Sequence, residues 1–183
     1  MPERIIKDGA IVEDNWQVVR ELEGDLPSGN IIVPAQRWLD EKDALQARGN
    51  VAVWLASDQS PKILGDAIND FALIAVDFPA FADGRGFSYG RELREQHGFS
   101  GDLRAIGNFM RDQLAYLSRC GFNSFALQNS DLEAALQSLQ NFSVHYQVSI
   151  DNPQPLFGPP GLILTPWLSR GVITFSTMPA KRS

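Results

Sequence analysis

Short apolar runs alternate with helix-like segments along most of this sequence, and this alternation limits the fold more than any other feature. The apolar runs are residues 31–33, 51–55, 71–76, 103–106 and 122–127. Segments with helical patterns lie at 39–48, 61–70, 87–97, 109–120 and 131–140. Strands that alternate with helices of this length predict βαβ units and a parallel sheet.

About five βα units are too few to close an eight-stranded barrel. We therefore predict an α/β fold with an open, mostly parallel, Rossmann-like sheet, and a partial β/α barrel completed by dimerisation is the alternative. Residues 1–157 are interpreted as a single α/β domain, in which the acidic, turn-rich residues 1–29 form a β-type arm. Residues 158–183 are interpreted as a C-terminal extension of atypical composition, because no acidic residue follows Asp151.

Composition excludes several functional classes. A formal net charge of −6 opposes general attraction to nucleic acid or to anionic membranes. With one cysteine, Cys120, and two histidines far apart in sequence, no disulfide framework, zinc site or other metal site is expected. No segment approaches about 18 uninterrupted apolar residues, and the N-terminus turns acidic where a signal peptide needs an apolar run, so we expect a cytoplasmic protein.

The segment after the third apolar run contains a glycine-rich turn, Gly84-Arg85-Gly86, which Ser88 follows at a predicted helix start. Its glycines are spaced G-x-G-x-x-x-G, which is not the dinucleotide fingerprint, and no P-loop lysine follows. Two interpretations stay open. Backbone N–H groups, the helix dipole and a guanidinium would favour a small anion. A strand-to-helix turn also favours glycine and a capping serine without any ligand.

A second unusual feature is Arg104, which lies inside an otherwise apolar predicted strand. A buried arginine needs a carboxylate or a ligand, and Asp77 at the end of the neighbouring strand is the candidate partner. The alternative is that Arg104 forms an internal ion pair and only stabilises the sheet. The predicted ligand site comprises Asp83, Gly84, Arg85, Gly86, Ser88, Arg104, Arg111 and Gln113, with Asp77 as the candidate catalytic residue.

Known catalytic sets are not found, so enzymatic activity stays an open question. The sequence contains no G-x-S-x-G nucleophile elbow and suggests no cysteine–histidine pair. An oxidoreductase would need a bound flavin or nicotinamide, because no side chain here carries electrons. The sequence shows no fingerprint for either cofactor.

Three strings carry a family resemblance: D-G-R-G-F-S (83–88), L-R-A-I-G (103–107) and R-D-Q-L (111–114). With them, residues 4–157 resemble a bacterial family of unknown function whose members are described as probable oxidoreductases involved in sulfite reduction. Gly90 stands where this family commonly has alanine, at a cost of about 1 kcal/mol in a helix.

The resemblance implies an accessory protein of assimilatory sulfite reduction, either an oxidoreductase or a protein that binds a small oxyanion at the 83–88 loop. The alternative is a non-catalytic module that docks on sulfite reductase or a related enzyme. A homo-oligomer is compatible with both hypotheses.

Overall fold

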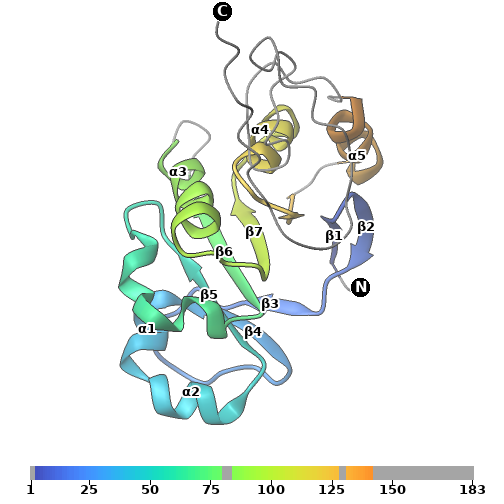
Figure 1. The fold of residues 1–183 in the computed structure, drawn as a ribbon. Helices are drawn as coiled ribbons and strands as arrows, with labels where there is room; N and C mark the ends of the chain where they lie inside the picture. The colour runs from blue at the N-terminus through green and yellow to red at the C-terminus, as the bar shows by residue number, and fades with distance from the viewer. Residues whose placement is uncertain (1–2, 80–83, 128–130, 142–183) are drawn as a thin grey trace, which may run out of the picture.

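The computed structural model describes residues 3–79, 84–127 and 131–141 (Figure 1). Its strands are β1 (Arg4–Lys7), β2 (Ala10–Glu13), β3 (Trp16–Val18), β4 (Asn30–Pro34), β5 (Val51–Leu55), β6 (Leu73–Phe78), β7 (Asp102–Gly107) and β8 (Ser124–Phe125). Its helices are α1 (Ala35–Asp40), α2 (Lys42–Arg48), the 3₁₀ helix η1 (Pro61–Asp70), α3 (Arg85–Arg91), the π-helix η2 (Glu92–Gln96), the 3₁₀ helix η3 (Arg111–Gln113), α4 (Leu114–Arg119) and α5 (Leu132–Asn141).

The strands form an 8-stranded curled sheet in the order β2-β1-β8-β7-β6-β5-β4-β3. Strands β3 to β8 are parallel and follow chain order, whereas β1 is antiparallel to both of its neighbours. The predicted mixed α/β fold with a mostly parallel sheet is confirmed. Because the order contains no reversal, the sheet has no switch point of the doubly wound kind, and the arrangement is that of the partial-barrel alternative.

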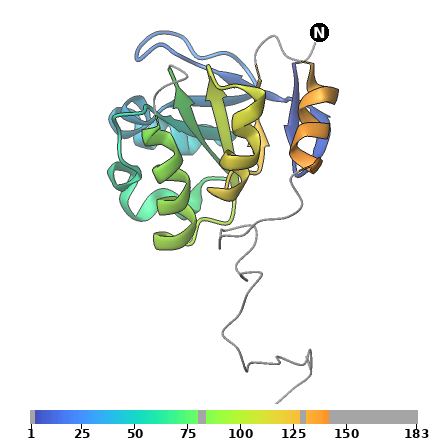
Figure 2. The ribbon, with the colours of Figure 1, turned by 90° about the horizontal axis from the view of Figure 1, so that it is seen from above.

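The two edge strands of this half-barrel are consecutive in the chain. Strand β2 ends at Glu13 and β3 begins at Trp16, so the bend at Asp14-Asn15 carries the chain from one edge of the sheet to the other. Strand β2 also runs in the direction of the parallel strands, because it is antiparallel to β1. Strands β2 and β3 therefore act as one bent ribbon that bridges the open side of the half-barrel (Figures 1 and 2).

The sheet separates a large outer core from a small inner one. The helices cover the outer face (Figure 2), where Trp38, Leu45, Ile68, Leu93, Leu117 and Ala135 pack against Val53, Ile74, Val76 and Phe125. Among the described residues, the buried members of the inner core are all in strands: Ile32, Ala52, Leu73, Ala75 and Ile106, with Trp16, Trp54 and Ala126 packed against them. The pleat, which points successive side chains to opposite faces, therefore determines which residues can reach the interior of the half-barrel.

Glycines end the helices much as their positions in the sequence suggest. Gly49, Gly98 and Gly121 all have positive φ. The Phe122 N–H donates to the Leu117 carbonyl, as a Schellman cap requires. The Phe99 N–H reaches one residue further back, to Leu93, because η2 is a π-helix.

Gly90 in α3 has a packing reason. A Cβ at this position would overlap the Phe122 ring and lie 2.8 Å from the Cys120 carbonyl oxygen. The close approach of α3 to the loop before β8 therefore depends on the missing side chain.

Candidate ligand site at the carboxyl mouth

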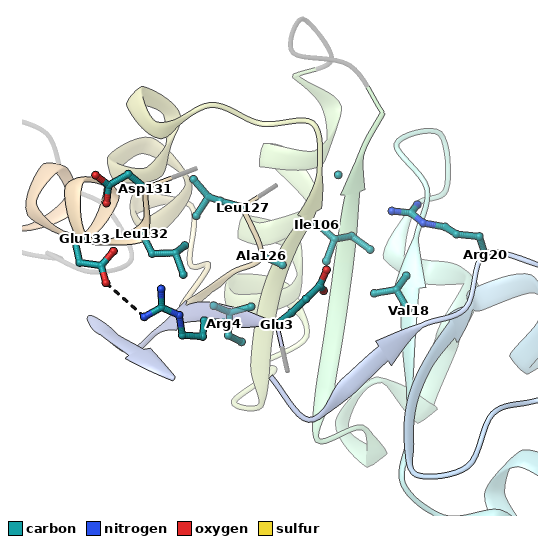
Figure 3. A pocket seen from close by; sticks show the side chains of 12 residues that line it. Glu3, Arg4, Val18, Arg20, Ile106, Ala126, Leu127, Asp131, Leu132 and Glu133 are labelled. Atoms are coloured by element: carbon teal, nitrogen blue, oxygen red, sulfur yellow. Dashed lines mark hydrogen bonds and ion pairs between the residues drawn. The ribbon is translucent and has the colours of Figure 1, made fainter. Parts of the chain in front are cut away.

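The carboxyl ends of the parallel strands open into a cavity of about 790 Å³ on the inner side of the half-barrel (Figure 3). It is lined by Glu3, Arg4, Ile5, Val18, Arg20, Ile106, Gly107, Ala126, Leu127, Asp131, Leu132 and Glu133. These residues come from the start of β1, the ends of β3, β7 and β8, and the first turn of α5. Ligands bind at the carboxyl ends of parallel strands both in barrels and in open α/β sheets, so this mouth is the candidate site.

Arg20 is the cation with the most defined position in this mouth. It lies just past β3, and its Nη1 is 2.9 Å from Oδ1 of Asp77, near the end of β6. Its guanidinium also lies over the Trp54 ring, 5.1 Å from the centroid, and the Trp54 indole N–H donates to the Val19 carbonyl. The carboxylate and the aromatic ring together hold the guanidinium at the rim, while 44% of the Arg20 side chain stays exposed.

Gly107 permits the close approach of β7 to Asp77. Its φ is +95°, and a Cβ there would lie 2.7 Å from Asp77 Oδ1 and 2.5 Å from the Phe78 carbonyl oxygen. Only glycine adopts this conformation without strain and also leaves this space free. Asp77 is thereby seated against the backbone of the neighbouring strand, with its carboxylate directed at Arg20.

Below this mouth, Arg104 projects into the interior and binds the bend between the two edge strands. Its Nη1 donates to both carboxylate oxygens of Asp14, at 3.0 and 2.9 Å, and its Nε donates to Ser124 Oγ at 3.2 Å. The side chains of Arg104 and Asp14 are only 2% and 5% exposed. The prediction that Arg104 pairs with Asp77 is therefore wrong. Arg104 instead forms an internal ion pair with Asp14, as the alternative interpretation expected.

The β-register explains this correction. Asp77 and Arg104 share the inner face, but Asp77 pairs with Ile106 whereas Arg104 pairs with Ala75, two residues further from the carboxyl ends. A second cavity of about 480 Å³ lies on the amino side and includes Asp14 and Arg104 in its lining. The Arg104–Asp14 pair thus separates the two mouths of the half-barrel.

The glycine-rich turn does not share a site with Arg104. Gly84 precedes α3, and a Cβ at Gly86 would meet Phe78 and Val76, whose side chains belong to the outer core. Arg85 reaches the loop after β5, where its Nη2 donates to Ser57 Oγ at 3.2 Å. The sheet lies between this turn and the guanidinium of Arg104, so the structure does not bring the two together on one rim.

The remaining predicted site residues are dispersed. Ser88 is exposed inside α3 and does not cap it, because the helix begins at Arg85, earlier than the sequence predicted. Arg111 is exposed in η3, and Gln113 Oε1 accepts the Met110 N–H, beyond the end of β7. Asp83 lies outside the described residues. Whether any of these residues contacts a ligand stays a prediction.

Sequence analysis missed Asp14, Arg20 and Ser124. The first two belong to the segment that was interpreted as an arm, whose strands in fact form both edges of the sheet. One signal was present: a buried arginine requires a carboxylate, and the acidic N-terminal segment supplies one. Nothing in the sequence shows which acid of that segment turns inward.

Within the described ranges, no group of three or more histidine, cysteine, aspartate or glutamate side chains is placed to hold a metal ion. In the same part of the chain, no helix combines the length and apolarity needed to cross a membrane.

Comparison with known proteins gives one family and no named relative. Residues 52–157 match a family model described as a bacterial protein of unknown function, DUF934. No match was found among curated proteins or among solved structures. The matched span begins in β5, so it includes Asp77 and Arg104, whereas their partners Arg20 and Asp14 precede it.

Proposed function

Since this chain belongs to the bacterial family of unknown function DUF934, we propose its function from the geometry of the carboxyl mouth. The protein binds a small molecule with an anionic group there and acts in the cytoplasm as an accessory protein of assimilatory sulfite reduction. The observation that carries the binding proposal is the cavity of about 790 Å³ in which Arg20 is held by Asp77 and Trp54. The family resemblance carried by residues 83–88, 103–107 and 111–114 supports the metabolic setting.

The chemistry of the arginine favours an anionic group. A guanidinium has five N–H donors, and the ion pair with Asp77 engages Nη1, so donors remain for a ligand. Arg20 is already oriented before a ligand arrives, which lowers the entropic cost of binding. In this proposal Asp77 orients the arginine and stays the candidate group for moving a proton. A redox reaction would require a flavin or a nicotinamide in addition.

Titration with anions tests the proposal. Sulfite, sulfate and phosphate are added separately to the purified chain while thermal unfolding is followed, and an absorption spectrum shows whether a flavin co-purifies. Binding of a ligand to the native state raises the unfolding temperature as its concentration rises. Arg20→Ala should abolish the response, whereas Arg91→Ala, which changes an exposed arginine of α3 on the outer face, should preserve it. An unchanged response in Arg20→Ala would remove the mouth from the site.

A second candidate function, docking on sulfite reductase or a related enzyme, is favoured by apolar side chains at the surface. Met110 and Tyr116 are 50% and 53% exposed, and the Tyr116 ring contacts Phe87 at a centroid distance of 4.9 Å. Co-purification with the reductase that is lost in Met110→Ser/Tyr116→Ser, in a chain that binds none of the three anions, would favour docking over ligand binding.

A further inference from the structure

The carboxyl mouth carries both positive and negative side chains around an apolar floor. Arg20 lies on the β3 side, and Asp131 and Glu133 lie on the α5 side (Figure 3). Glu3 is drawn between them, beside Ile106. We propose that the ligand is a zwitterion of the α-amino acid class, whose carboxylate binds Arg20 and whose ammonium group binds Glu3. This inference rests on the proposed function, because it names the ligand of the same mouth.

The balance of charge argues against a simple oxyanion as the preferred ligand. Three carboxylates line the cavity, those of Glu3, Asp131 and Glu133, against the two guanidiniums of Arg4 and Arg20. Arg20 is moreover shared with Asp77. An ion with only negative charge would meet repulsion from the acidic side, whereas a molecule that also carries an ammonium group would be attracted to both sides.

Among these acids, Glu3 is the one best suited to bind the ammonium group. Glu133 is 3.4 Å from Arg4 in an exposed ion pair, and Asp131 Oδ1 accepts the Ala134 N–H at the start of α5. Within the described part of the chain Glu3 makes no side-chain ion pair, and its backbone is fixed because its carbonyl accepts the Asp14 N–H. Glu3 therefore combines a fixed position with a carboxylate that is available to a ligand.

The floor of the mouth indicates the rest of the ligand. Val18, Ile106 and Ala126 are apolar and come from β3, from β7 and from the residue that follows β8. They make no hydrogen bonds through their side chains, so they favour an aliphatic group over a polar one. An α-amino acid with an aliphatic side chain such as leucine combines all three features: a carboxylate, an ammonium group on the adjacent carbon and an apolar side chain.

Calorimetric titration of the full chain with three matched compounds tests the inference. The compounds are L-leucine, 4-methylpentanoate, which lacks the amine, and 3-methylbutylamine, which lacks the carboxylate. We expect L-leucine to bind at least about tenfold more tightly than either analogue, because each analogue leaves one charged side chain without its partner. Sulfite is titrated in parallel.

Two variants assign the charges. Arg20→Ala should weaken the binding of L-leucine and 4-methylpentanoate but not that of 3-methylbutylamine. Glu3→Gln should weaken the binding of L-leucine and 3-methylbutylamine but not that of 4-methylpentanoate. Glu23→Gln, an exposed acid that is not part of the cavity lining, is the control and should change neither. Circular dichroism verifies that each variant folds.

The outcomes separate the two proposals. If sulfite or 4-methylpentanoate binds through Arg20 as tightly as L-leucine, the zwitterion inference is overturned and anion binding at the mouth stands. If none of the four compounds binds, both proposals fail. Binding of L-leucine that is unaffected by Glu3→Gln also overturns the inference, because the amine is then recognised elsewhere.

Discussion

The pair formed by Arg104 and Asp14 allows a quantitative test of the fold, through the substitution Asp14→Asn. The asparagine keeps the size of the side chain and an oxygen that can accept the Trp16 N–H, as Asp14 Oδ1 does at 3.1 Å. It removes the negative charge that faces the Arg104 guanidinium and replaces one of the two oxygens that accept from Arg104 Nη1 by an NH2 group, which cannot accept. At nearly constant side-chain volume, the substitution therefore tests the charge and the hydrogen bonds of the contact that secures the bend between the edge strands.

The burial of both groups sets the expected size of the effect. The side chains of Arg104 and Asp14 are only 2% and 5% exposed, so water has little access to replace the lost carboxylate. Breaking a buried ion pair by removing one partner costs about 3–5 kcal/mol, against a total stability of about 5–15 kcal/mol for a typical domain. The free energy of unfolding of a small protein falls by about 1–3 kcal/mol for each molar of urea, so the urea concentration at the unfolding midpoint should fall by at least about 1 M.

Urea unfolding, followed both by tryptophan fluorescence and by circular dichroism, measures the change in the free energy of unfolding. Glu23→Gln, an exposed acid of the same N-terminal region, is the matched control and should change this free energy by less than about 0.5 kcal/mol. A double-mutant cycle with Arg104→Met then isolates the coupling between the two side chains. A loss below about 1 kcal/mol for Asp14→Asn, or a cycle without coupling, would refute the account of a desolvated pair that holds the bend.

Three further substitutions test individual packing and hydrogen-bond arguments, each by urea unfolding. Gly90→Ala should destabilise the chain by about 1–3 kcal/mol through overpacking against Phe122 and the Cys120 carbonyl, although it improves helix propensity; a gain in stability would contradict this. Arg94→Lys should lower the free energy of unfolding by about 1–3 kcal/mol. The guanidinium donates to the carbonyls of residues 99, 101 and 121 and to the Asn123 side chain, and one ammonium group cannot replace it. An unchanged unfolding midpoint would show that these hydrogen bonds contribute little. Burial lowers the pKa of the Arg94 guanidinium, and the nearby Asp102 and Asp8 act in the opposite direction. Gly107→Ala should destabilise the chain by about 1–3 kcal/mol, because the position has a positive φ and an added Cβ would contact Asp77. It should also weaken the binding of any ligand held by Arg20, which Asp77 orients. Unchanged stability and affinity would show that β7 can move away from Asp77.

The sequence predicts the central strands and their helices closely, because each of them carries its own local signal. The apolar run predicted at 51–55 is β5, residue for residue, and the one at 103–106 lies inside β7. A helical pattern between two such runs leaves little choice about the topology of a βα unit. The glycines after the helices add end points that local chemistry alone determines.

The curvature of the sheet and the composition of the site depend on contacts between distant residues, which local patterns do not encode. Asp14 lies 90 positions from Arg104 in the chain. Arg20 follows the edge strand β3, whereas Asp77 lies in β6, with β4 and β5 between these two strands in the sheet. The curl of the sheet brings their side chains within 2.9 Å. The predicted set that centred on Arg85 and Arg104 was built on closeness to the strand ends, which did not distinguish the outer from the inner face of the sheet.

One segment, residues 14–20, both bridges the half-barrel and supplies its ligand-binding cation. Asp14 secures the bend on Arg104, Trp16 packs on the inner core, and Arg20 reaches Asp77 across the mouth. A ligand that binds Arg20 therefore stabilises the same segment that the buried Arg104–Asp14 pair holds in place. Ligand binding and the buried pair both favour the conformation in which this segment bridges the half-barrel, so each strengthens the effect of the other. The family model matches residues 52–157, so residues 14–20 lie outside the matched span. Contacts such as Arg104–Asp14 and Arg20–Asp77 connect this segment to the matched residues. The site therefore requires both parts of the chain. Residues 52–157 include Asp77 but not Arg20, the arginine that Asp77 orients.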